Sequence, residues 1–90
     1  MNKARRKELA NLKERIENLQ SEINDIQLEL ETLKDEEQDY LDNIPDNLQG
    51  SERYDKAEQA VSSLEEAYDT LQTMYEEASE VFDSIDEACE

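Results

Sequence analysis

The chain has 90 residues, of which 36% are hydrophobic and 39% charged, and it carries a formal net charge of −17. This length allows one small domain, and the chain has neither an 18-residue apolar run to span a membrane nor an apolar signal segment, so we expect a cytoplasmic location. The absence of histidine and the single cysteine exclude a zinc finger, a Cys–His nucleophile and a disulfide framework.

The first predicted helix covers about residues 2–43 and carries an unbroken heptad pattern. Its apolar positions recur with alternating steps of three and four residues, which is typical of a coiled coil. They are Leu9, Ile16, Ile23 and Leu30 at heptad position a and Leu12, Leu19, Ile26 and Leu33 at position d. Glu37 is a polar exception at a later a position, where it either fixes the register or reaches water or Arg53. We expect the helix to end near Asn43, because Pro45 disfavours helical geometry in the residue before it.

The predicted loop covers residues 44–50 and contains the only proline and the only glycine of the chain. Ser51 suits the N-cap of the next helix, with Glu52 in its first turn. A calcium loop of the EF-hand type does not fit, because Ile44 or Leu48 falls where an oxygen ligand is required. We therefore expect no metal and no other cofactor.

The second predicted helix covers about residues 51–89 and has two apolar stripes. The first is expected in the core of a hairpin and includes Val61, Leu64, Tyr68, Leu71, Tyr75, Ala78, Phe82 and Ile85. The second recurs every seven residues and consists of Ala60, Ala67, Met74, Val81 and Ala88. Three apolar positions per heptad indicate a helix that contacts more than one neighbour.

Folding the chain at its loop brings the two tracks together layer by layer. The residue numbers of each pair add up to 94, from Leu9 with Ile85 to Leu33 with Val61. The sequence therefore predicts an all-α fold, an antiparallel two-helix coiled-coil hairpin that forms a single domain over residues 1–90. The basic residues of the first helical turns, which give residues 1–15 a net charge of +4, are expected to lie beside the acidic C-terminus as counter-charges.

The second stripe predicts how the hairpin associates. It is symmetric about Met74, so the second helix can meet its twin antiparallel, with Ala60 opposite Ala88 and Ala67 opposite Val81. We expect a C2 homodimer that forms an elongated four-helix bundle. The alternative is that this stripe binds a different, unidentified protein.

Most of the chain, including its heptad-bearing first helix, resembles small acidic helical-hairpin proteins of bacteriophages and bacterial mobile elements. The likeness is carried by the proline turn that runs into NLQGSERY and by the acidic units LEEA, YEEA and IDEA. The resemblance implies a phage or mobile-element setting, in which small acidic proteins serve as accessory factors or as inhibitors of host enzymes. It brings no functional residue to this chain.

Two functions fit these features, and neither is catalytic. We do not expect an enzyme, because the chain has no histidine, no glycine-rich phosphate loop and no nucleophile beside a base. The first function is a protein–protein interaction or assembly module that acts through helix faces. The alternative is an acidic nucleic-acid mimic that inhibits a host nucleic-acid-binding or defence protein by occupying its basic groove. We expect no direct binding to nucleic acid or to membranes, and we expect Cys89 to be a reduced thiol, buried or frayed, without a function of its own.

Overall fold

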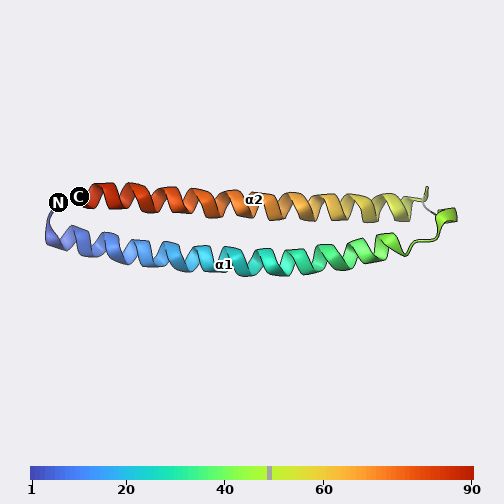
Figure 1. Cartoon of the computed structure of the whole chain (residues 1–90), viewed down its shortest axis with the longest axis horizontal. Coiled ribbons are helices and arrows are strands. Elements are labelled where there is room, and N and C mark those ends of the chain that lie inside the picture. The colour runs from blue at the N-terminus through green and yellow to red at the C-terminus, as the bar shows by residue number, and fades with distance from the viewer. Residues whose placement is uncertain (49) are drawn as a thin grey trace.

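The computed structural model describes residues 1–48 and 50–90 and is a hairpin of two long helices. Helix α1 spans Lys3–Asp42, a short 3₁₀ turn η1 spans Asp46–Leu48, and helix α2 spans Glu52–Cys89. The helices run antiparallel, and both chain ends lie at the end of the rod opposite the loop (Figure 1). The rod measures 70 × 16 × 13 Å. The predicted all-α hairpin is therefore confirmed, although Gln49 of the predicted loop lies outside the described residues.

Polar side chains cap both ends of α1 and the start of α2. The Asn2 side chain accepts a hydrogen bond from the backbone N–H of Arg5 at 2.8 Å, which begins α1. At the other end of α1, the Asn43 side-chain amide donates to the Asp39 carbonyl at 2.7 Å. The Ser51 hydroxyl accepts the backbone N–H of Tyr54 at 3.3 Å. The predicted N-cap of the second helix is thus confirmed.

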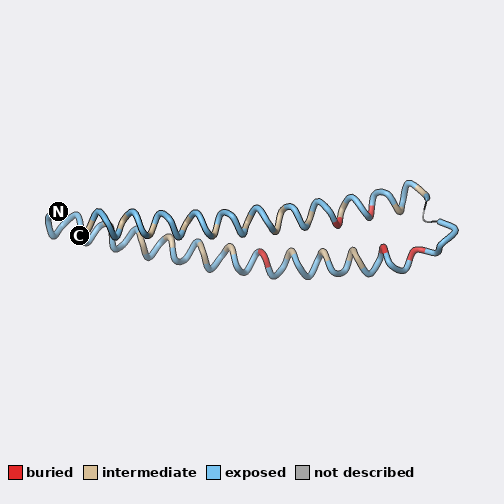
Figure 2. The backbone as a smooth tube through the Cα atoms, turned by 45° about the horizontal axis from the view of Figure 1, so that its top comes forward, coloured by how far each residue is buried: buried red, intermediate tan, exposed pale blue. Residues whose placement is uncertain are grey.

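The buried apolar core is small and lies at the loop end of the rod. Its buried apolar residues are Leu41, Ile44, Ala57 and Val61, with Tyr54 packed against them. Farther from the loop, the described residues that line the contact between the helices are mostly half-buried (Figure 2). The exception is Gln27, a polar residue that is only 4% exposed. Most of the rod is therefore held together by an interface that remains partly open to water.

Helix α1 is rotated relative to the orientation that its heptads predict. The a positions Leu9, Ile16, Ile23 and Leu30 lie half-buried against α2. The d positions are exposed, and these are Leu12, Leu19, Ile26 and Leu33. The prediction that these four residues lie in the hairpin core is therefore wrong.

The side facing α2 is completed instead by polar residues at position e, one residue after each d position. They are Lys13, Gln20, Gln27 and Lys34, and all four are buried or half-buried. Long polar side chains can occupy such places, because their methylene stems pack against apolar neighbours while the polar heads reach hydrogen-bond partners. On α2 the predicted track does face α1. Val61 is buried, and Leu64, Tyr68, Leu71, Tyr75, Ala78, Phe82 and Ile85 are half-buried.

Candidate interaction surface

One line of large exposed side chains follows helix α1. It consists of Leu12, Leu19, Ile26, Leu33 and Tyr40. Residues seven apart lie on nearly the same side of a helix, so the line runs for about 42 Å at about 1.5 Å per residue. Leu19 is 61% exposed, which is unusual for a leucine at a heptad core position. The d positions, which are half of the apolar pattern that predicted the coiled coil, are therefore exposed.

Helix α2 carries a second line with the same period. Met74, Val81 and Ala88 are exposed, whereas Ala60 and Ala67 are half-buried. These are the five residues that the sequence marked as a candidate interface. The hairpin thus leaves both of its heptad-spaced apolar lines accessible.

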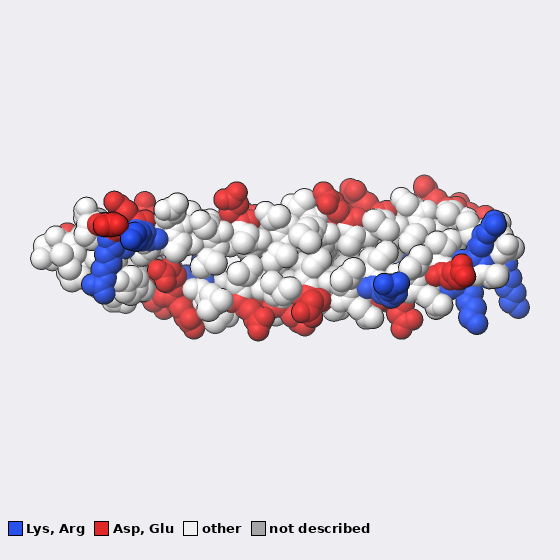
Figure 3. All heavy atoms as spheres, turned by 180° about the vertical axis from the view of Figure 1, so that it is seen from behind, with Lys and Arg blue, Asp and Glu red and all other residues white. Residues whose placement is uncertain are grey.

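Both lines lie on the same face of the hairpin. At the loop end, Arg53 lies seven residues before Ala60, and its Nε donates a hydrogen bond to the Tyr40 hydroxyl. Its guanidinium carbon is also 5.6 Å from the centre of the Tyr40 ring. Figure 3 shows this face as a band of uncharged atoms between two rows of acidic side chains. We call the two lines together the apolar face.

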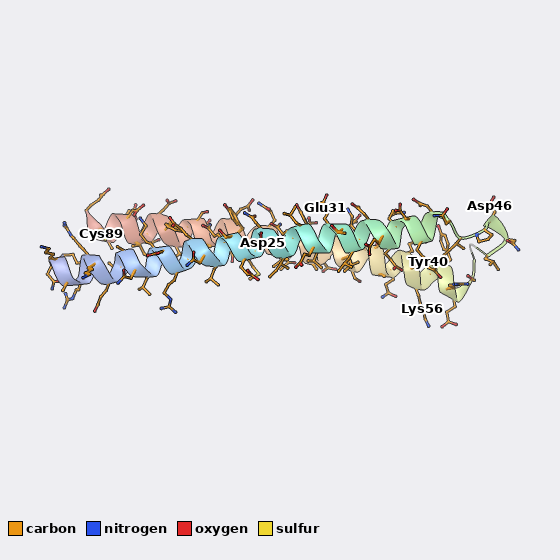
Figure 4. All side chains as sticks on the ribbon, turned by 90° about the horizontal axis from the view of Figure 1, so that it is seen from below. Asp25, Glu31, Tyr40, Asp46, Lys56 and Cys89 are labelled. Atoms are coloured by element: carbon orange, nitrogen blue, oxygen red, sulfur yellow. The ribbon has the colours of Figure 1, made fainter. Side chains whose placement is uncertain are left out.

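The opposite face is lined by pairs of polar residues that join the helices. The pairs are Lys13 with Asp86, Gln20 with Ser79, and Gln27 with Gln72. Lys34 and Glu65 continue the series, and both line one groove between the helices. We call these pairs the polar ladder. Glu31, which lines the same groove, lies on the other side of α1 from Tyr40 (Figure 4).

The two glutamines of the ladder also bind the backbone of α2. Gln27 Nε2 donates to the Gln72 side-chain oxygen at 3.1 Å and to the Tyr68 carbonyl at 3.4 Å. Gln20 Nε2 donates in the same way to the Tyr75 carbonyl at 3.1 Å. These bonds connect the side of α1 that carries positions a and e to α2, and in this orientation the d positions of α1 are exposed.

The sequence interpretation missed the ladder, although a signal was present. Both halves recur every seven residues, and each pair of residue numbers adds up to 99. The pairs are also chemically matched, with lysines opposite acidic residues and amides opposite a hydroxyl or an amide. A search for polar heptads in complementary register would have found them.

Charge is unevenly neutralised between the helices. Among the ion pairs of the described residues, only that between Lys13 and Asp86 joins α1 to α2. The hydrogen bond to the Asp86 carboxylate raises the pKa of Lys13 above its usual value of 10.5. Arg5, Arg6 and Arg15 make no ion pair with any described residue. Most of the basic N-terminal segment is therefore available to other charges.

No group of three or more acidic or cysteine side chains in the described part of the chain is placed to hold a metal ion. Cys89 is a free, half-buried thiol at the open end. Neither described helix has a stretch long and apolar enough to cross a bilayer.

Compared with known proteins, the chain matches no family model, no curated protein and no solved structure.

Proposed function

We propose that the chain is a non-catalytic interaction or assembly module whose contact surface is the apolar face. The observation that carries this proposal is the line of exposed d positions on α1, in which large apolar side chains recur over about 42 Å. Isolated exposed leucines are ordinary, but a continuous apolar patch bordered by charged residues is typical of a protein–protein contact.

The rotation of α1 supports the same proposal. The helix uses its a and e positions to contact α2 and leaves its d positions on one flank. A helix in a bundle contacts two neighbours, and apolar residues on both flanks of its seam are what this arrangement requires. The second neighbour of α1 is then outside the hairpin.

Nucleic-acid mimicry is a second candidate, supported by the acidic rows in Figure 3. Residues 25–70 contain 15 acidic and three basic residues, a net charge of −12 at the loop half of the rod. Such a surface attracts a basic groove, and the attraction weakens as salt screens it. The apolar band between the acidic rows has no counterpart on a phosphate backbone, so we place mimicry second.

The setting of the proposed function follows from the NLQGSERY resemblance. We place the module in the cytoplasm of a bacterium that carries a phage or mobile element. There it would act as an accessory factor through its partner, without chemistry of its own.

Leu19→Glu and Leu28→Glu are matched variants that test the apolar face. Leu19 is 61% exposed on this face. Leu28 is 64% exposed and lies on the other side of α1, about 200° around the helix from Ile26 of the apolar face. Both changes add one charge to an exposed position of α1, so both variants should keep their helical circular dichroism. We expect Leu19→Glu alone to abolish association, whether with itself or with a protein retained from a bacterial extract.

The salt dependence of this association separates the two candidate functions. An association that survives about 0.5 M NaCl and is lost only in Leu19→Glu supports the apolar face. Association that salt releases, and to which both variants respond alike, supports mimicry instead. If the wild-type chain binds neither itself nor any extract protein, the proposed function is wrong.

A further inference from the structure

We propose that a second copy of the chain covers the apolar face, with the two hairpins antiparallel about a twofold axis that crosses α1 at Ile26. This inference rests on the proposed function and names the partner of that face. In this arrangement each α1 packs on the partner's α1, and each α2 packs on the partner's α2. The loop end of one hairpin lies over the open end of the other.

The contacts within the hairpin fix where such an axis can lie. Gln27 contacts Gln72 and the Tyr68 carbonyl, so Ile26 is level with the part of α2 between Ala67 and Met74. The α1 line extends two heptads to either side of Ile26. A twofold axis at this level therefore maps the α1 line onto itself, as an isologous interface requires.

The same axis pairs residues of complementary size. On α1, Leu19 meets the partner's Leu33. On α2, Ala67 meets the partner's Met74, and Ala60 meets the partner's Val81. Each small side chain of α2 thus faces a larger one, which fills a layer without overcrowding it. The hairpin register therefore shifts the expected centre on α2 away from Met74, the centre that the sequence pattern alone predicts.

Net charge selects the antiparallel arrangement over the parallel one. The open half of the rod, residues 1–24 and 71–90, contains six basic and 11 acidic residues, a net charge of −5. The loop half, residues 25–70, has a net charge of −12. Parallel hairpins would place −12 against −12, whereas antiparallel hairpins place −12 against −5 and reduce the repulsion. The antiparallel dimer also brings Lys13 and Arg15 level with residues 37–39 of the partner's α1, which contain two acidic residues.

One contact would be specific to this dimer. Arg15 and Glu36 each lie three residues after a d-position leucine, so they border the apolar face on the same side. They are 21 residues apart on one helix, about 32 Å, and do not meet within the hairpin. About a twofold axis at Ile26, Arg15 lies opposite the partner's Glu36, and this ion pair occurs twice.

A charge-exchange cycle on the full chain, followed by sedimentation equilibrium at low salt, tests this dimer. We expect Arg15→Glu to raise the dimer dissociation constant about tenfold, since it removes two exposed ion pairs and adds two repulsions. Glu36→Arg should weaken the dimer similarly. The double variant Arg15→Glu with Glu36→Arg should return the dissociation constant to within about threefold of wild type.

Asp25 provides the control for net charge. It lies on the outer side of α1 (Figure 4), and Asp25→Arg changes the charge by the same amount as Glu36→Arg. Arg15→Glu combined with Asp25→Arg should stay as weak as Arg15→Glu alone. The antiparallel dimer is overturned if Glu36→Arg and Asp25→Arg both restore the dissociation constant of Arg15→Glu, or if neither restores it.

The oligomeric state of the wild-type chain in solution separates this inference from the proposed function. A chain that stays monomeric at all concentrations overturns the inference. If an extract protein is nevertheless bound and Leu19→Glu abolishes that binding, the proposed function stands with another partner. If Leu19→Glu changes nothing, both are wrong.

Discussion

The two ends of the hairpin are stabilised in different ways. At the loop end, Leu41, Ile44, Ala57 and Val61 are buried within a single chain. At the open end, no described residue of 1–26 or 62–90 is buried. There the helices are joined by half-buried apolar layers, by the hydrogen bonds of Gln20 to α2 and by the ion pair between Lys13 and Asp86. The loop end resembles a small folded domain, and the open end resembles half of an interface.

This difference indicates what the hairpin lacks. The loop brings nearby parts of the chain together at a low cost in loop-closure entropy, so a small core suffices to fix the turn. The open end gains less from burial, and Leu12, Leu19 and Val81 remain exposed there. In the proposed dimer each loop end lies over the partner's open end, so the well-packed part of one chain supports the weaker part of the other.

The largest expected effect comes from placing a carboxylate in the loop-end core. Val61 is 7% exposed and Val81 is 47% exposed, and both are valines of α2. Val61→Asp buries an unpaired charge and should reduce the stability of the hairpin by more than about 4 kcal/mol, with loss of most of its helical circular dichroism. Val81→Asp, at a concentration where the chain is monomeric, should keep most of that signal. Equal losses of signal would show that the two ends are packed alike.

A smaller effect compares the two glutamines of the polar ladder. Gln27 is buried, whereas Gln20 is only half-buried nearer the open end. Gln27→Ala removes hydrogen bonds from a water-poor site and should cost about 1–2 kcal/mol in urea unfolding. Gln20→Ala should cost about 0.5–1 kcal/mol, because water can replace the lost amide. A larger cost at Gln20 would contradict a gradient of burial from the loop to the open end.

The heptads, the turn and the N-cap at Ser51 made the hairpin predictable from the sequence. Strict alternation of three and four residues determines the helical period, and Pro45 interrupts it where the chain turns. Two tracks read independently then meet in one register. This register agrees with the contact between Gln20 and the Tyr75 carbonyl, which lies in the predicted layer of Leu19.

The rotation of α1 about its own axis was not predictable in the same way. A heptad pattern identifies the apolar stripe, but it does not say which flank of the stripe contacts which neighbour. The sequence interpretation assumed one neighbour for α1, although not for α2, and therefore placed Leu12 and Leu19 inside the hairpin. In the structure the polar ladder lies there instead, because Gln20 and Gln27 turn toward α2 and find hydrogen-bond partners for their own amides. The residues that were misplaced are those that form the α1 line of the apolar face.

The smallest expected effect concerns the ion pair that joins the helices at the open end. The hydrogen bond to Asp86 raises the pKa of Lys13 above 10.5 in the folded chain. A raised pKa means that the stabilisation is fully present below pH 10.5 and is lost as the pH rises through the folded-state pKa. Arginine stays protonated over this range, so Lys13→Arg serves as the reference for all other effects of pH on the chain. Between about pH 9 and about pH 12, the wild-type melting temperature should fall relative to that of Lys13→Arg. Parallel curves would mean that Lys13 and Asp86 do not join the helices in solution, and that the open end is held by its half-buried apolar layers and by the hydrogen bonds of Gln20.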